Sequence, residues 1–439
     1  MPRTLLSGGR IIDPVSRRDA PGDVVIDGDR IAAVTDPGAG GEAETRIDCT
    51  GLLVLPGLVD PHVHLREPPP APGRQTPRAE PLAETIATGA AAAVAGGFTT
   101  VCAMPNTLPP VDSAEAVAAY IARGRETAAA HVFVAGCLTR GREGRDVADL
   151  EGMRRAGAVA FTDDGSDVAD DAVFEACLAE AARLAAPVLC HCEDAALAGD
   201  GAVHAGPTAK RLALPGIPRE AEDAAVRRAC LAAERTGCRV HVMHVSTAGA
   251  VEQVRRAKAR GAPVTAEATP HHLALTADAL AGGDAVFRVN PPLRSRRDVT
   301  AVRAGVRDGT IDCLASDHAP HPASAKARPL AEAPPGMIGL ESALAIYIDT
   351  FIRTQGLDWL DLADRLTLGP ARALALVPPA LAAGAPADVT VIDPSARWRI
   401  EPDRFASRAR NCPFAGREVC GRAARTLVAG RTVSENDTA

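Results

Sequence analysis

His62 and His64 stand two residues apart at the end of an apolar run, in the string DPHVHL. Side chains two residues apart on a β-strand point to the same face, so both imidazoles can bind one cation. Exposed turns and chance also produce His-X-His pairs. The pair therefore indicates a metal site only if the rest of the chain supplies further ligands.

Three more residues of the right chemistry end other apolar runs. His191 ends PVLCH, His244 ends RVHVMH, and Asp317 ends IDCLASD. Imidazole nitrogens and carboxylate oxygens are the ligands that zinc takes most often besides thiolates. Together with the first pair, these residues are enough to bind two metal ions.

Two divalent ions roughly 3.5 to 4 Å apart repel each other unless negative charge lies between them. Asp163 and Asp164 end the run AVAFTDD, where a carboxylate could serve as that bridge. We favour Asp164, although the sequence does not separate the two neighbours well. The alternative for an Asp-Asp-Gly triplet is a plain turn.

The positions of these residues follow from eight apolar runs that alternate with Ala-rich amphipathic stretches, a pattern typical of repeated βα units. The runs are LLVLPGLVDPHVHL, FTTVCAMPNT, HVFVAGCLT, AVAFTDDG, PVLCHCED, RVHVMHVST, PVTAEATPHH and IDCLASDHAPH. Eight parallel strands predict an α/β fold, a (β/α)8 TIM-type barrel over residues 57–384. Its active site would lie at the carboxyl ends of the strands.

Both chain ends differ from this pattern. Residues 1–56 contain short strands separated by Gly-Asp turns, which indicates antiparallel hairpins, and residues 385–439 are similar. We expect the two ends to form a small composite β-sandwich. The Pro-rich segment 67–83 predicts a long loop after the first barrel strand, either shaping the mouth of the site or forming a solvated insertion.

Composition excludes several classes of protein. The net charge of -7 is small, and no basic stripe indicates a nucleic-acid partner. The first residues are not typical of a signal peptide, and no apolar stretch reaches about 18 residues, so we expect a cytoplasmic protein and no membrane contact. The eleven cysteines are interpreted as reduced core residues. Only three lysines occur, and none precedes Lys210.

With these residues in place, the chain resembles the bacterial long-chain (class I) dihydroorotases of the amidohydrolase superfamily along nearly its whole length. The strings that carry the resemblance are DPHVHLREP (60–68), MPNT (104–107), FTDDG (161–165), HCED (191–194), LPGIPREAE (214–222), HVMHVSTAGAVE (241–252), VNPPLRS (289–295), SDHAPH (316–321) and IGLE (338–341). One departure is the loop after His321, which lacks the acidic pair followed by Lys that the family often has there.

The resemblance implies a binuclear zinc site, with two Zn²⁺ ions per subunit bridged by Asp164 and a hydroxide. One ion would be held by His62, His64, Asp164 and Asp317, and the other by Asp164, His191 and His244. The resemblance also implies a set of residues that contact the substrate, chiefly its α-carboxylate. They are His64, Arg66, Asn106, Asn290, His321, Pro335 and Gly336.

The implied reaction interconverts L-dihydroorotate and N-carbamoyl-L-aspartate in pyrimidine biosynthesis, with Asp317 as general acid and base. Allantoinases and hydantoinases share the barrel but normally require a bridging carbamylated lysine, which residues 1–209 cannot supply. A weakly active scaffold subunit of aspartate carbamoyltransferase is the other alternative. An active enzyme could also bind aspartate carbamoyltransferase, and we expect a homo-oligomer.

Overall fold

The protein is described by a computed structural model that covers residues 3–69, 83–354 and 356–436. Most of the Pro-rich loop predicted at 67–83 therefore lies outside the described residues. Within the described residues, no helix combines the length and apolar character that a membrane crossing requires.

Eight parallel strands form the predicted (β/α)8 barrel, and each comes from one of the eight apolar runs. In chain order they are β6 (Leu58–Val63), β7 (Phe98–Ala103), β8 (His131–Gly136), β9 (Ala160–Phe161), β10 (Val188–Cys190), β13 (Val240–Val242), β14 (Val264–Ala268) and β15 (Cys313–Leu314). The first and last strands meet where Val63 bridges to His318 and the His64 amide donates to the His318 carbonyl at 2.8 Å. The fold class predicted from the sequence is confirmed.

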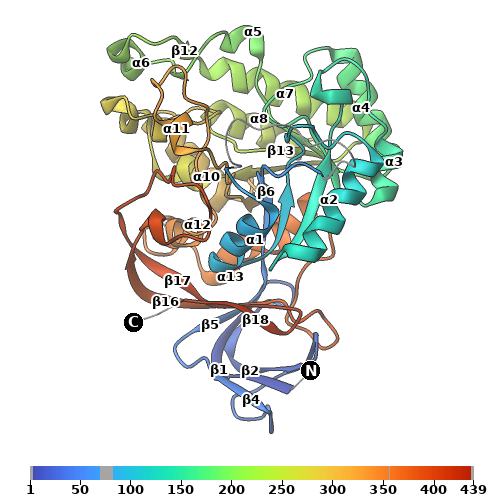
Figure 1. The fold of residues 1–439 in the computed structure, drawn as a ribbon, viewed down its shortest axis with the longest axis vertical. Helices are drawn as coiled ribbons and strands as arrows, with labels where there is room; N and C mark the ends of the chain where they lie inside the picture. The colour runs from blue at the N-terminus through green and yellow to red at the C-terminus, as the bar shows by residue number, and fades with distance from the viewer. Residues whose placement is uncertain (1–2, 70–82, 355, 437–439) are drawn as a thin grey trace.

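Helices surround these strands (Figure 1). Those that follow the barrel strands are α1 (Ile86–Ala95), α2 (Ala114–Thr127), α3 (Leu150–Ala156), α4 (Asp171–Arg183), α7 (Arg219–Thr236), α8 (Ala248–Ala259), α10 (Arg296–Arg307) and α13 (Trp359–Leu366). The buried faces of α1 and α7 are rich in Ala, and small side chains let a helix pack close to the sheet. Capping boxes at Thr85 and Ser295 fix the starts of α1 and α10.

Shorter elements lie in the loops between these units. They are α5 (Ala195–Ala198), β11 (Val203–His204), α6 (Pro207–Leu212), β12 (Gly216–Ile217), α9 (Pro270–Ala274), α11 (Ala323–Lys326), α12 (Ala343–Tyr347) and α14 (Leu368–Ala373). Most of them belong to the loops at the carboxyl ends of the strands, where the predicted site lies.

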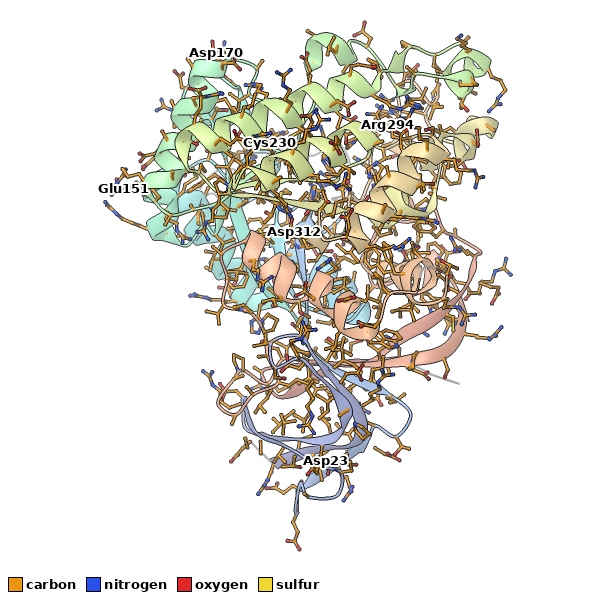
Figure 2. The ribbon with its side chains drawn as sticks, turned by 180° about the vertical axis from the view of Figure 1, so that it is seen from behind. Asp23, Glu151, Asp170, Cys230, Arg294 and Asp312 are labelled. Atoms are coloured by element: carbon orange, nitrogen blue, oxygen red, sulfur yellow. The ribbon has the colours of Figure 1, made fainter. Side chains whose placement is uncertain are left out.

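A buried arginine joins three of these loops. Arg294, labelled in Figure 2, is 2% exposed and donates to Glu222 Oε2 at 3.2 Å, Ser246 Oγ at 3.0 Å and the Ile217 carbonyl at 3.1 Å. Ile217 and Glu222 come from the string at 214–222 of the family pattern, and Ser246 comes from the string at 241–252. Arg294 and these three partners therefore support the loops around the site, and none of the four is itself a candidate ligand.

The two chain ends form one eight-stranded sheet beneath the barrel, where Figure 1 shows blue N-terminal and red C-terminal strands together. Its strands are β1 (Arg3–Asp13), β2 (Arg18–Asp27), β3 (Arg30–Thr35), β4 (Thr45–Asp48), β5 (Leu53–Pro56), β16 (Val389–Arg399), β17 (Glu418–Val428) and β18 (Arg431–Glu435). The antiparallel hairpins β1–β2 and β2–β3 agree with the prediction.

The expectation of hairpins throughout the first fifty residues was wrong for β4 and β5, which pair parallel to β1. The chain returns across the sheet after β3, so β4 runs in the same direction as β1. Buried Asp23, labelled in Figure 2, holds this return by accepting from the amides of Gly8 at 2.8 Å and Gly38 at 2.9 Å.

The sheet and the barrel share apolar contacts. Leu55 of β5 and Ile392 of β16 belong to the same buried cluster as the barrel core, while a second cluster around Ile11 and Val24 lies within the sheet. The proposed domain division, 1–56 with 385–439 and 57–384, stays a prediction, with one boundary at the end of β5 and the other shortly before the start of β16. All eleven cysteines lie within the described residues and are buried and unpaired, as predicted.

Candidate active site

The six candidate ligands come together at the carboxyl ends of the barrel strands. His62 and His64 end β6, and the other four follow β9, β10, β13 and β15. All six are buried. The structure thus brings together every residue predicted as a metal ligand, which is the outcome expected when parallel strands end at one face of a barrel.

One cluster combines His62, His64 and Asp164. The Asp164 carboxylate lies 3.8 Å from His62 Nε2 through Oδ1 and 3.5 Å from His64 Nε2 through Oδ2. Asp317 Oδ1 is 3.4 Å from His62 Nε2 and 3.1 Å from His64 Nε2. Two imidazoles and two carboxylates therefore surround one point.

A second cluster combines Asp164, His191 and His244. His191 Nδ1 lies 3.7 Å from Asp164 Oδ1 and 2.8 Å from His244 Nε2. Asp164 belongs to both clusters, so its two oxygens can serve two cations at once. This is the arrangement that an anionic bridge requires.

The residues present fit a pair of divalent cations. His62 Nε2 is fully buried and has no hydrogen-bond partner among the described residues, although it faces both carboxylates. Burial opposes the negative charge of Asp164, but His64 and His62 hold the pKa of this carboxyl below its ordinary value. A set of four imidazoles and two ionised carboxylates matches the ligands that zinc prefers.

The neighbouring aspartates have different surroundings. The Asp163 carboxylate points away from the histidines and accepts from the amides of Leu138 at 2.9 Å and Thr139 at 3.1 Å, and from the Thr139 hydroxyl. Asp163 thus holds the loop after β8, while Asp164 faces the histidines. The geometry supports the choice of Asp164 as the bridge.

A chain of buried hydrogen bonds fixes His62 from behind. Its Nδ1 donates to Glu267 Oε1 at 2.7 Å, and Glu267 Oε2 accepts from His241 Nε2 at 3.0 Å. His241 Nδ1 in turn lies 2.8 Å from Thr265 Oγ1. Burial opposes the charge of Glu267, but His62 and His241 lower its pKa to about 2. The carboxylate therefore keeps the proton on His62 Nδ1 and leaves Nε2 for a metal.

A cavity of about 300 Å³ lies beside the two clusters. All of the residues predicted to contact substrate line it, namely His64, Arg66, Asn106, Asn290, His321, Pro335 and Gly336. Asn290 Oδ1 is buried without a hydrogen-bond partner among the described residues, so this carbonyl can accept a bond from a ligand amide.

Asn106 and His321 already have protein partners. Asn106 accepts from His64 Nδ1 at 2.9 Å and donates to Asp164 Oδ2 at 2.9 Å, so it links two candidate ligands. Burial and the nearby Arg66 lower the pKa of His321 to about 3, so the ring is neutral at pH 7. Its Nε2 lies 2.8 Å from the Pro335 carbonyl and donates to it. Substrate contact by both residues stays a prediction.

Two cations line the cavity. Arg66 has a left-handed backbone (φ 57°) and donates through Nε to the Pro320 carbonyl at 3.2 Å. Burial lowers the pKa of Arg66 to about 10, so the guanidinium is charged at neutral pH. The second cation, Arg142, donates to the carbonyls of Asp163 at 3.3 Å and Asp164. Sequence reasoning missed Arg142 because Arg140 and Arg145 lie in the same loop and no pattern separates them.

Comparison with known proteins identifies the family. A family model described as "Dihydro-orotase-like" matches residues 51–250. A dihydroorotase of Anaeromyxobacter sp. (strain K) is 44% identical over 98% of this chain and 97% of its own length. A dihydroorotase of Pelotomaculum thermopropionicum is 44% identical over 99% of both chains.

A solved structure has the same fold. The L-hydantoinase of Arthrobacter aurescens superimposes with a TM-score of 0.84 at 24% identity, over 99% of this chain and 96% of the other. At that identity the likeness establishes the barrel and its attached sheet but not the substrate. The identity to the dihydroorotases along the full chain is far higher, and the chain belongs to the dihydroorotase family of cyclic-amide hydrolases.

Proposed function

We propose that the chain catalyses the reversible hydrolysis of L-dihydroorotate to N-carbamoyl-L-aspartate, as a long-chain (class I) dihydroorotase of pyrimidine biosynthesis. The observation that carries this proposal is the pair of ligand clusters sharing Asp164, beside a cavity that contains the guanidinium of Arg66. The clusters suit hydrolysis of an amide, and the cation suits a substrate that carries a carboxylate.

Two zinc ions are the proposed cofactors. His62, His64, Asp164 and Asp317 would hold one ion, and Asp164, His191 and His244 the other. When bound, such ions supply a water of lowered pKa and polarise the amide carbonyl. Glu267 orients His62 for this task, and Asn106 holds His64 and Asp164 in position relative to each other through its two hydrogen bonds.

Asp317 is the proposed catalytic acid and base. Its carboxylate lines the cavity, and one carboxylate oxygen lies 3.1 Å from His64 Nε2. In the hydrolytic direction, Asp317 would accept the proton of the attacking water and transfer it to the departing ring nitrogen. In the reverse direction, it would take the proton from the carbamoyl nitrogen as the ring closes.

Recognition of the substrate would begin with its α-carboxylate. Arg66 offers a planar fork of donors for this group, and His321 lines the same cavity. The Asn290 carbonyl and the backbone of Pro335–Gly336 would contact the edges of the ring. A neutral hydantoin lacks the carboxylate and would leave the half-buried charge of Arg66 without a partner.

Both alternatives are less well supported. A hydantoinase or allantoinase would need the bridging lysine, yet Asp164 occupies the shared position and residues 1–209 contain no lysine. A scaffold subunit has no need of metal ligands, whereas here all six candidates come together. Binding to aspartate carbamoyltransferase, homo-oligomerisation and a cytoplasmic location stay predictions, and light scattering with and without that enzyme tests the first two.

The proposed substrate is tested by a comparison of three rings. We would load the purified chain with zinc and measure the rates of opening of dihydroorotate, hydantoin and allantoin at equal concentration. We expect opening of dihydroorotate alone, because only this ring has a carboxylate for Arg66. Faster opening of hydantoin or allantoin would reject the assigned substrate.

A further inference from the structure

One wall of the cavity consists of residues 334–336, which belong to no helix or strand. Pro334, Pro335 and Gly336 line the cavity here. A Cβ atom at Gly336 would lie 2.8 Å from His321 Nε2 and 3.0 Å from the Ala319 carbonyl, so this wall packs directly against the segment of Ala319 and His321, which also lines the cavity. Such a segment needs bonds from elsewhere to keep its place.

Lys326, at the end of α11, supplies part of this support. Its Nζ donates to the carbonyls of Arg288 at 3.2 Å, Pro334 at 3.0 Å and Gly336 at 3.0 Å. Burial and the nearby Arg288 lower the pKa of Lys326 to about 8, so at neutral pH most of the side chain is an ammonium with one N–H for each carbonyl. Among the residues that the structure describes, no Asp or Glu forms an ion pair with it.

Asn411 supplies further support. This buried side chain follows the barrel in the sequence and precedes β17. Its Nδ2 donates to the carbonyls of Ala319 and Gly336, each at 3.1 Å, and its Oδ1 accepts from the His321 amide at 3.2 Å. A single side-chain amide thereby joins the Gly336 segment to the segment of Ala319 and His321.

We infer that Lys326 and Asn411 are positioning residues that hold the Pro335–Gly336 wall and His321 at the spacing that the substrate ring requires. The inference rests on the proposed function for the identity of the ring. The support of the wall by Lys326 and Asn411, which we call the clamp, rests on hydrogen bonds alone. The Gly336 carbonyl accepts from both residues, and the Gly336 amide donates to the Arg288 carbonyl at 2.9 Å. Removal of either side chain would leave a buried carbonyl with fewer donors.

The test uses Lys326→Met, which keeps an unbranched side chain but removes the three donors. Lys210→Met is the matched control, because Lys210 is an exposed lysine on α6. Hydrogen exchange of the zinc-loaded full chain would follow the peptide that contains the Gly336 amide. We expect at least about tenfold faster exchange in Lys326→Met and no change in Lys210→Met.

Kinetics add a second, independent measurement. We expect Lys326→Met to raise KM for dihydroorotate about tenfold and to change kcat by less than about threefold, because the wall contacts the bound ring in the ground state as well. Bound zinc should stay unchanged. Asn411→Asp removes the Nδ2 donor from the other side of the wall, and it should shift exchange and KM in the same direction if Lys326→Met fails to fold.

Unchanged exchange at Gly336 in both variants would overturn the inference, whatever the activity. A loss of kcat with constant KM would also overturn it, because the residues would then act on the reaction instead of the wall. If wild type opened no dihydroorotate but the exchange results held, the proposed substrate would fail while the clamp stood.

Discussion

Asp163 and Asp164 are neighbours in the sequence, but their carboxylates point in different directions. The Asp163 carboxylate accepts hydrogen bonds from the amides of Leu138 and Thr139, whereas the Asp164 carboxylate faces the histidines of both clusters. Arg142 completes the connection by donating to both aspartate carbonyls. One residue thus secures the loop, and its neighbour is available to bridge two cations.

Substitution of each aspartate by asparagine separates these tasks. Asp164→Asn should bind fewer than two zinc ions per chain, because a neutral amide cannot offset the repulsion between two divalent ions. Asp163→Asn should keep its zinc but lose about 1–3 kcal/mol of unfolding free energy with the bonds to Thr139. Elemental analysis and chemical unfolding measure the two quantities. The opposite pattern would reassign the bridge to Asp163.

Glu267 should matter for metal affinity although it is no candidate ligand. Glu267→Gln removes the charge that holds the proton on His62 Nδ1, and we expect about 10- to 100-fold weaker zinc binding. Competition with a chelator measures this affinity without any turnover. Thr265→Val, which removes the far end of the same hydrogen-bond chain, is the milder control. Equal zinc affinity in wild type and Glu267→Gln would show that Glu267 contributes to the packing of the barrel and not to metal binding.

The sequence allowed the six candidate ligands to be predicted because each ends an apolar run, and parallel strands end at one face of the barrel. The supporting residues could not be predicted, because their roles depend on partners distant in the chain. Glu267 bonds to a residue 205 positions away, and Asn411 to residues 75 and 92 positions away. Nothing in the sequence separates Lys326 from the exposed Lys210.

At the scale of elements, the positions of the eight barrel strands could be predicted from the apolar runs, but the lengths of the strands could not. β9 and β15 contain only two residues each. The buried apolar stretch around each is longer, because loop residues beyond the strand are buried by the site itself. The relative direction of the paired N-terminal strands could not be predicted either, since a short strand has the same alternation of side chains whether its partner is parallel or antiparallel.

Glu341, which precedes α12, bonds to the segment between β16 and β17 and should make the free energy of unfolding depend on pH. Its carboxylate accepts from the amides of Ala406 and Ser407, but burial raises its pKa to about 7 from an ordinary 4.5. The folded protein therefore holds this proton more tightly than the unfolded chain. The resulting stability is complete below pH 4.5 and is lost as the pH rises through about 7.

Chemical unfolding of wild type and Glu341→Gln at pH 5 and pH 8 measures this effect. The wild type should lose about 2 kcal/mol of unfolding free energy relative to the variant between these two pH values. The relative comparison cancels the titration of all other groups. A difference that stays constant with pH would contradict a raised pKa at Glu341.

At the scale of the whole molecule, the C-terminal part of the chain does more than complete the sheet. The segment between β16 and β17 returns to the barrel, where Ser407 donates to buried Glu84 at 2.5 Å and Asn411 reaches the cavity wall. The pairing of the two chain ends was predictable from their similar strands. This return was not, because the segment has no periodic apolar pattern.

The central claim is that this binuclear site opens dihydroorotate with Asp317 as acid and base. The most direct measurement is turnover of dihydroorotate by zinc-loaded wild type and by Asp317→Asn, with bound metal counted in both. We predict that the variant retains zinc at the Asp164–His191–His244 cluster while kcat falls about 10²- to 10⁴-fold. Turnover of the variant near the wild-type rate would contradict the account.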